Sequence, residues 1–224
     1  MTAGTVRILI VAATSIEVAP VVARLREMSE RGPRLTRYAH AAHDVDVLIT
    51  GVGMVATAAW CSRALALSRY DVALNFGVCG SFDQALKAGD VVHVVTDRIA
   101  ELGAEDGETF LSIQELNLPG EHEFTNVAPP ANAALARLRS VGGITVNTVH
   151  GCTRSIAAVT ERFKPQVESM EGAAFMQACL IHDVAFAQVR AVSNVVERRN
   201  RDAWKLADAI GALGSTALSI LDHA

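Results

Sequence analysis

The sequence predicts one α/β domain with three layers, in which helices cover both faces of a central mixed, mostly parallel sheet. Two observations lead to this prediction. Nearly continuous aliphatic runs, which are typical of strands buried on both faces, alternate along the chain with segments of helical periodicity. The 224 residues contain no repeat and no linker-like segment, so we expect a single domain over residues 1–224.

The first half of the chain begins with an aliphatic run at 6–13, which predicts a central strand. Ser15 is expected to cap the next helix, in which aliphatic residues between 18 and 25 recur at helical spacing. The elements that we expect after it are strands near 35–40 and 45–50, a helix from about 54 to 68, a buried strand at 71–77 and a strand at 91–95.

The region 98–130 is the least regular part of the sequence, and it carries many acidic residues and three of the six prolines. We interpret it as loops and short excursions that form a lid or a partner contact. The elements expected after it are a helix at 131–139, a strand at 143–150, a short helix at 157–163, a strand or loop at 165–168, a helix at 171–181, a strand at 185–192 and a helix at 202–221.

Composition and charge exclude several classes of binding partner and indicate the compartment. The formal net charge of −4 leaves no basic surplus for a nucleic acid. No segment has the roughly 18 consecutive apolar residues of a membrane span, and the N-terminus lacks a signal-peptide layout. The four cysteines form no CxxC pair and have no metal-ligand spacing. We therefore expect a cytoplasmic protein with reduced cysteines, no metal and no cofactor.

Ligands of open α/β sheets bind beyond the carboxyl ends of the strands. This rule selects the segments that directly follow predicted strands, and polar or glycine residues are frequent in them. The selected positions are Glu17, 51–54, 77–81, 151–155, 168–171 and 193–194.

Four of these segments resemble motifs of the nucleoside phosphorylase/methylthioadenosine nucleosidase superfamily. The motifs are AATSIEV (12–18), LNFGVCGSFDQALKAGDVV (74–92), VESMEGAAF (167–175) and VRAVSNVV (189–196). They occur in the family's order over nearly the whole chain. The resemblance implies the family's fold, a small-molecule nucleoside substrate and a homo-oligomer, either dimer or tetramer.

A finer resemblance is to the futalosine hydrolases. It depends on ELGAEDGETF (101–110), on one extra residue between the glutamates of VESMEGAAF, on Asn194, and on VERRNRDAW (196–204). It implies hydrolysis of futalosine to hypoxanthine and dehypoxanthinyl futalosine, a reaction of menaquinone biosynthesis.

The chemistry itself requires particular groups. Cleavage of a purine–ribose bond builds positive charge on the sugar, so the site needs an activated water and anchors for the hydroxyls. Glu17 is our candidate to activate the water, although a first-turn glutamate also stabilises a helix by itself. Glu171 is expected to accept hydrogen bonds from the ribose hydroxyls, because its two oxygens suit two vicinal hydroxyls. Met170 is expected to pack against the ribose, and Glu168 fits the family's spacing less well.

Asn194 stands where the adenine-specific nucleosidases have an aspartate that protonates the leaving base. An amide cannot supply that proton, but it both donates and accepts hydrogen bonds. A 6-oxopurine presents an acceptor oxygen and an N–H donor where adenine has the reverse polarity, so Asn194 favours hypoxanthine over adenine. The resemblance implies further substrate-binding residues, namely Val78, Cys79, Gly80, Thr153, Arg154 and Ser193.

Several alternatives remain open at this point. A phosphorylase of the same fold, an adenine-releasing nucleosidase acting on methylthioadenosine, S-adenosylhomocysteine or aminofutalosine, and a non-catalytic nucleoside-binding protein are the competing functions. Glu17 disfavours the phosphorylase because its charge opposes a phosphate anion. Several arginines are candidates to bind the substrate carboxylate, namely Arg154, Arg198, Arg199 and Arg201. The scattered histidines are expected to be core or surface residues.

Overall fold

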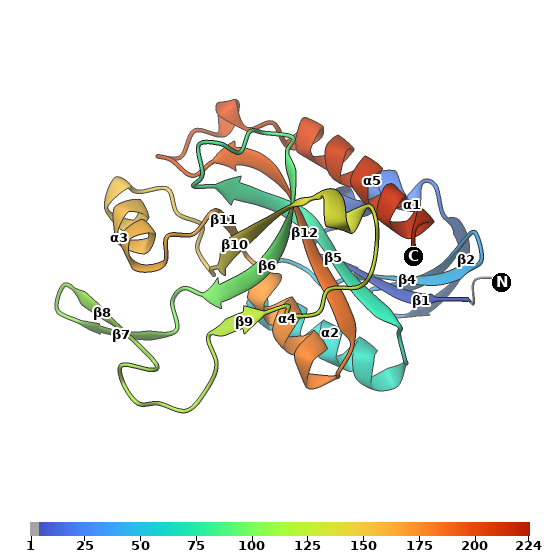
Figure 1. The fold of residues 1–224 in the computed structure, drawn as a ribbon, viewed down its shortest axis with the longest axis horizontal. Coiled ribbons are helices and arrows are strands. Elements are labelled where there is room, and N and C mark those ends of the chain that lie inside the picture. Colours follow the sequence, from blue (N-terminus) through green and yellow to red (C-terminus); the bar gives the residue numbers. More distant parts are fainter. Residues whose placement is uncertain (1–4) are drawn as a thin grey trace.

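A ten-stranded mixed sheet forms the middle layer of the computed structural model, which describes residues 5–224 (Figure 1). The strands of this sheet are β1 (Arg7–Ala12), β2 (Arg26–Gly32), β3 (Leu35–His40), β4 (His43–Ile49), β5 (Val72–Ser81), β6 (Val91–Ile99), β9 (Glu123–Thr125), β10 (Arg139–Thr145), β11 (Val167–Ser169) and β12 (Ala185–Val195). Strands β7 (Gly103–Asp106) and β8 (Thr109–Ser112) form a separate hairpin.

The strand order and pairings close part of the sheet into a ring. The order is β11-β10-β6-β12-β5-β1-β4-β3-β2, with β9 beside β6. The central pairs β4–β1, β1–β5 and β5–β12 are parallel, as are β6–β10 and β10–β11, whereas β12–β6 and the β2–β3–β4 edge are antiparallel. Strand β11 also pairs with β5, so five strands close into a ring. The predicted mixed α/β sheet is confirmed.

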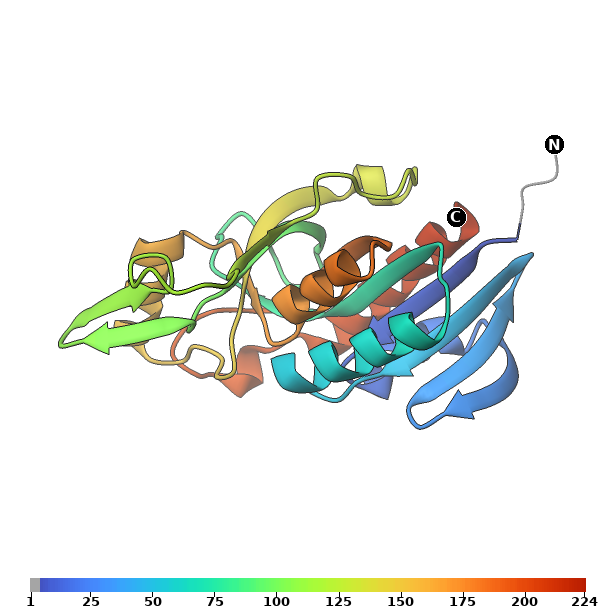
Figure 2. The same ribbon diagram turned by 90° about the horizontal axis from the view of Figure 1, so that it is seen from below.

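Helices cover both faces of this sheet (Figure 2). They are α1 (Ser15–Val22), α2 (Met54–Leu67), α3 (Thr153–Phe163), α4 (Gly172–Ile181) and α5 (Leu206–Asp222). Helices α2 and α4 pack on one face, and α1 and α5 pack on the other. In β1, Leu9 and Val11 join the first core, whereas Ile8 and Ile10 join the second. Side chains alternate across a strand, so a strand covered on both faces needs a continuous aliphatic run.

Two expectations at element boundaries are wrong. The residue that caps α1 is Thr14, one position before Ser15. Strand β5 does not end in a turn at Gly77 but continues to Ser81. It continues because β12 and β11 pair with its last residues on both sides, and these pairings are not visible in the local sequence.

The segment around residue 139 also differs from the prediction. Instead of a helix at 131–139, the structure has a single 3-10 turn at Leu135–Arg137. The Asn132 carboxamide accepts the backbone N–H groups of Ala134 and Leu135 and so stabilises a turn. Strand β10 spans Arg139–Thr145, so it overlaps the strand predicted at 143–150 but begins four residues and ends five residues earlier, because its register follows β6.

The edge strand β2 was absent from the prediction. All its residues are exposed, and its sequence, REMSERG, is mostly polar and charged. Hydrophobic periodicity cannot detect such a strand, and charged residues are common at sheet edges because they disfavour pairing with other chains.

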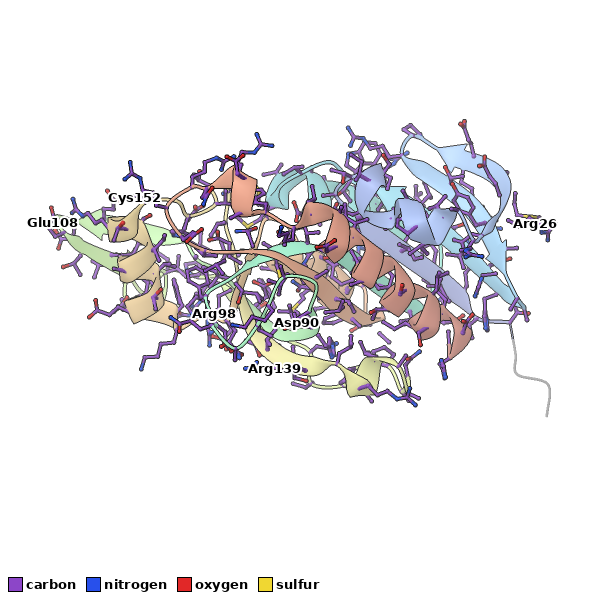
Figure 3. All side chains as sticks on the ribbon, turned by 90° about the horizontal axis from the view of Figure 1, so that it is seen from above. Arg26, Asp90, Arg98, Glu108, Arg139 and Cys152 are labelled. Atoms are coloured by element: carbon purple, nitrogen blue, oxygen red, sulfur yellow. The ribbon has the colours of Figure 1, made fainter. Side chains whose placement is uncertain are left out.

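The irregular region expected at 98–130 contains the β7–β8 hairpin, which projects from the body of the protein at the end opposite β2 (Figures 1 and 2). Figure 3 shows Glu108 and Cys152 at that same end and Arg26 at the other. Among residues 5–224, no helix combines the length and the apolar character needed to cross a membrane.

Candidate active site

Glu17 lies where β1 turns into α1 and is almost fully buried. Its Oε2 atom accepts the Thr14 backbone N–H at 2.9 Å and the Thr14 hydroxyl at 3.0 Å. Its Oε1 atom accepts the Val78 backbone N–H at 3.2 Å. One carboxylate therefore caps the helix and also faces β5. A carboxylate has about four acceptor positions, so about one remains for a water molecule.

Glu171 lies immediately before α4 and is also buried. Its Oε1 atom accepts the Gly53 backbone N–H at 3.0 Å. Gly53 has a φ of +100°, a conformation that favours glycine. The 51–54 turn after β4 therefore positions a carboxylate that is 118 residues away in sequence. Met170, next to it, is half-buried.

Arg190 on β12 lies near Glu17 and Glu171 and is 1% exposed. These three residues form a buried cluster of charged side chains. Its Nη2 atom donates to the Asn75 carboxamide oxygen. A Cβ atom on Gly77 would lie 2.0 Å from Arg190 Nη1 and 3.0 Å from Glu17 Oε1. Glycine at position 77 therefore leaves the space in which the guanidinium approaches Glu17.

The charges of this cluster act on one another. Burial raises the pKa of the Glu171 carboxyl, and the charge of Glu17 raises it further. The positive charge of Arg190 and the Gly53 N–H act in the opposite direction. Two acidic side chains lie near one buried cation, an arrangement suited to binding hydroxyl groups and a water molecule beside a centre that becomes positive.

A second group of predicted residues lies in register across three strands. Glu168 on β11 and Asn194 on β12 both pair with Gly80 on β5, one from each side. The β12 register shifts between Val192 and Asn194, so Ser193 forms a bulge, a feature that re-aims side chains near functional sites. Glu168, Gly80 and Asn194 line one small cavity of about 50 Å³.

Hydrogen bonds hold the polar side chains of this cavity. The Ser193 hydroxyl lies 2.8 Å from Asn194 Oδ1 and 3.1 Å from the Cys79 carbonyl oxygen. Glu168 is bound to His150 through the histidine backbone N–H at 3.0 Å and through ring atom Nδ1. Burial raises the pKa of the Cys79 thiol to about 12, so Cys79 contributes its backbone and not a thiolate.

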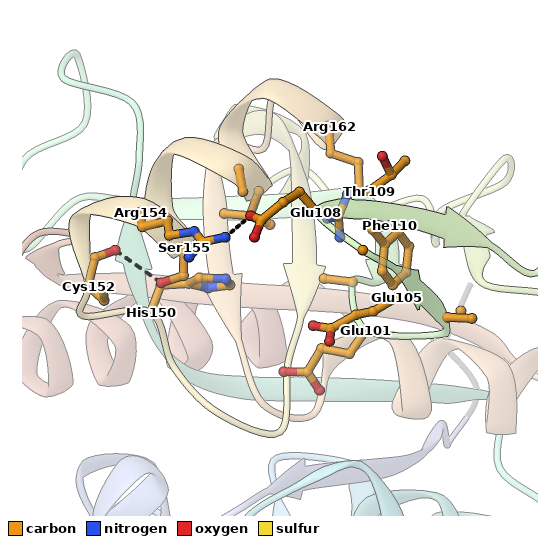
Figure 4. A pocket seen from close by; sticks show the side chains of 16 residues that line it. Glu101, Glu105, Glu108, Thr109, Phe110, His150, Cys152, Arg154, Ser155 and Arg162 are labelled. Atoms are coloured by element: carbon orange, nitrogen blue, oxygen red, sulfur yellow. Dashed lines mark hydrogen bonds and ion pairs between the residues drawn. The ribbon is translucent and has the colours of Figure 1, made fainter.

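Two predicted residues lie elsewhere. Arg154 lines a larger cavity of about 680 Å³ between α3 and the β7–β8 hairpin, where it forms an ion pair with Glu108 (Figure 4). Thr153 is exposed at the start of α3. Among the arginines considered for the substrate carboxylate, Arg199 lines the Asn194 cavity, with its guanidinium 5.5 Å from the Trp204 ring centroid.

Most of the chain is similar to known proteins. The sequence model described as the phosphorylase superfamily matches residues 7–222. The chain belongs to this superfamily. Futalosine hydrolase from Thermus thermophilus is 32% identical over 180 residues, covering 78% of this chain and 80% of the relative. Futalosine hydrolase from Streptomyces coelicolor is 32% identical over 179 residues, covering 75% and 74%.

Solved structures of the superfamily share the fold. Futalosine hydrolase of Helicobacter pylori has a TM-score of 0.83 at 16% identity, covering 98% of this chain and 99% of that chain. The 5′-methylthioadenosine/S-adenosylhomocysteine nucleosidase from Colwellia psychrerythraea, in complex with adenine, has a TM-score of 0.79 at 22% identity, covering 98% and 96%. At these identities the structures establish the fold.

Sequence patterns alone did not select two residues of the candidate site, Arg190 and His150. A signal for Arg190 was present, because a charged residue inside the apolar strand segment AFAQVRAV has to be buried with a partner. His150 had no such signal, since only the fold brings β11 beside the segment that follows β10.

A buried network supports the start of α4. The Asp97 carboxylate accepts hydrogen bonds from the Thr145 hydroxyl and the Gln188 amide, both at 2.9 Å. Thr145 Oγ1 in turn accepts the Ala173 N–H at 2.8 Å, in the first turn of the helix that follows Glu171. Burial is the main cause that raises the pKa of Asp97 to about 6.

Asp97→Asn is expected to remove a pH dependence of stability. An acid whose folded pKa is raised binds protons more readily in the folded state, so the parent loses stability as pH rises from about 4 to about 6. The difference is on the order of 3 kcal/mol. The neutral amide of the variant lacks this cost. If the Gln188 amide rotates, its Oε1 atom, which has no hydrogen-bond partner among residues 5–224 of the parent, accepts an N–H of the new amide. Urea unfolding at pH 4 and pH 7 measures the effect. If the free energy of unfolding changed equally between these two pH values in the parent and in the variant, the prediction would be contradicted.

Proposed function

We propose that this chain hydrolyses the N-glycosidic bond of futalosine, releasing hypoxanthine and dehypoxanthinyl futalosine for menaquinone biosynthesis. Three relatives named futalosine hydrolase, 31–32% identical over 75–78% of this chain, support the substrate. The observation that carries the reaction type is the buried cluster of Glu17, Glu171 and Arg190.

The cluster supplies what hydrolysis needs. Glu17 accepts the proton of a water molecule that attacks the sugar carbon C1′. Glu171 accepts hydrogen bonds from the ribose hydroxyls, and these strengthen as the sugar becomes positive. Burial and, to a smaller extent, the charge of Glu17 raise the pKa of Glu171, and the positive charge of Arg190 lowers it. The cavity at Asn194 receives the base, and its amide matches the oxygen and N–H of a 6-oxopurine.

The phosphorylase alternative fits this cluster poorly. Phosphate would lie against two carboxylates, with Arg190 as the cation buried beside them. Phosphate sites usually present several donors and cations to the anion. Water, which is neutral, carries no such electrostatic cost.

We also propose a homo-oligomer, dimer or tetramer, in the cytoplasm. Large apolar side chains are exposed on helices α2 and α4, which pack beside each other. These are Val55, Leu67, Leu180 and Ile181, with exposed fractions of 82%, 69%, 43% and 66%. Exposed apolar side chains of this size are frequent at interfaces. The four cysteines are free thiols, which suits a reducing compartment.

The proposal is tested by base release in phosphate-free buffer, with futalosine, methylthioadenosine and inosine assayed in parallel. We expect hypoxanthine from futalosine alone, at a rate that added phosphate does not change. Adenine released from methylthioadenosine would indicate the adenine nucleosidase instead. A requirement for phosphate would indicate a phosphorylase.

A further inference from the structure

The proposed hydrolysis leaves one proton without a source. As the bond between C1′ and the base nitrogen breaks, the base takes the electron pair and becomes anionic unless it is protonated. Asn194, the polar side chain at the end of β12, has no acidic proton to give. Another group in the same cavity, with a proton to transfer, can supply it.

We propose that His150, held in place by Glu168, donates this proton to the departing purine. The inference depends on the proposed function, because it concerns the leaving base of that reaction. His150 lines the Asn194 cavity of about 50 Å³ together with Glu168 and Gly80. Histidine is the side chain that most readily transfers protons near neutral pH.

The orientation of the ring follows from its hydrogen bonds. Glu168, which is 4% exposed, binds both the backbone N–H of His150 and ring atom Nδ1. With Nδ1 engaged, Nε2 is the nitrogen left free, and it has no hydrogen-bond partner among residues 5–224. The imidazole side chain keeps 13% exposure, so it is partly open to a ligand. A protonated imidazole carries N–H groups at both positions, one for Glu168 and one for the base.

The register of the sheet sets the distance between the groups that would flank the base. Glu168, Gly80 and Asn194 are neighbours across β11, β5 and β12. Adjacent strands are about 4.8 Å apart, so the backbones of Glu168 and Asn194 are separated by about 10 Å. A Cβ on Gly80 would lie 2.8 Å from Val196 Cγ2 and 3.4 Å from Asn194 Nδ2, so the glycine lets these side chains pack against β5. A planar base in the cavity that Gly80 lines has Asn194 on one side and the His150–Glu168 pair on the other.

Protons and electrons balance in this step. Breakage of the C1′–N bond gives its electron pair to the base, and His150 Nε2 gives a proton to a base nitrogen. The water oxygen forms the new bond to C1′, and Glu17 takes the water proton. Glu17 returns its proton to solvent, and His150 regains one from solvent. The net reaction consumes the nucleoside and one water molecule.

A change of leaving group separates proton donation from simple support of the fold. The test compares kcat/KM for futalosine with kcat/KM for its N7-methylated derivative, whose cationic base leaves as a neutral molecule without a proton. We expect His150→Gln to lower kcat/KM for futalosine by about 100-fold, the scale of general acid catalysis. The loss on the methylated nucleoside is expected to be less than about fivefold. Glu168→Gln is expected to show the same pattern with a smaller loss.

The controls make the result decisive. His223→Gln, on an exposed terminal residue that bonds only its own helix, is expected to leave both rates unchanged. Equal losses on both nucleosides, or no loss on either, would overturn the assignment of His150. Imidazole in solution is expected to restore part of the futalosine rate of His150→Ala, and absence of rescue would also count against it. If the parent protein releases no hypoxanthine from futalosine, the proposed function fails instead.

Discussion

Glu17→Gln is expected to lower kcat for futalosine by about 1,000-fold while the protein remains folded. The glutamine keeps an oxygen that accepts hydrogen bonds from Thr14 or Val78, so the first turn of α1 retains part of its support. It cannot accept a proton from water. Loss of a general base typically costs 10²- to 10⁴-fold in rate. Steady-state base release measures the effect.

The comparison for this variant is Glu30→Gln, the same change on the exposed edge strand β2. We expect Glu30→Gln to keep the parental rate and both variants to retain the parental fold by circular dichroism. The thermal midpoint of Glu17→Gln is expected to fall, because the amide replaces one charge-assisted contact. A fully active, folded Glu17→Gln would exclude Glu17 as the base that activates water.

Asn194→Asp is expected to lower kcat/KM for futalosine by about 100-fold. A carboxylate in place of the amide removes a donor and places negative charge opposite the oxygen of hypoxanthine. Sites that depend on matched hydrogen bonds discriminate strongly against a base that leaves a buried polar group unpaired. The same substitution is expected to create measurable adenine release from methylthioadenosine, since an aspartate can donate a proton to that base when protonated.

Asn117→Asp is the matched control, because Asn117 is exposed in a left-handed turn that asparagine and aspartate both tolerate. Rates are measured for futalosine and methylthioadenosine in parallel. If Asn194→Asp leaves futalosine cleavage intact and gains no adenine release, Asn194 does not select the purine.

Sequence patterns predicted most elements because the central sheet is covered on both faces. The aliphatic runs of β1, β5 and β12 and the helices α2, α4 and α5 lie close to their predicted positions. The failures occur where pairing, not local preference, determines the backbone. Strand β5 continues through Gly77 and Gly80 because β11 and β12 pair with it. Strand β10 starts at Arg139 because β6 sets its register.

The sequence likewise predicted some features of the candidate site and not others. The sequence predicted Glu17, Glu171 and Asn194, because each follows or ends a strand at the carboxyl edge of the sheet, where ligands bind. Their separate hydrogen bonds could not be predicted. Gly53 binds Glu171 across 118 residues, and Val78 binds Glu17 across 61.

By itself, the sequence determined the three-layer fold and the superfamily and pointed to the acidic residues of the candidate site, because periodicity and short motifs are local properties of the chain. Only the tertiary structure decided the partners of those residues. It placed Arg190 over Gly77 beside Glu17, and it joined His150 to Glu168. The physical reason is that a buried charged or polar group is stable only with a partner, and the fold brings that partner from a distant strand.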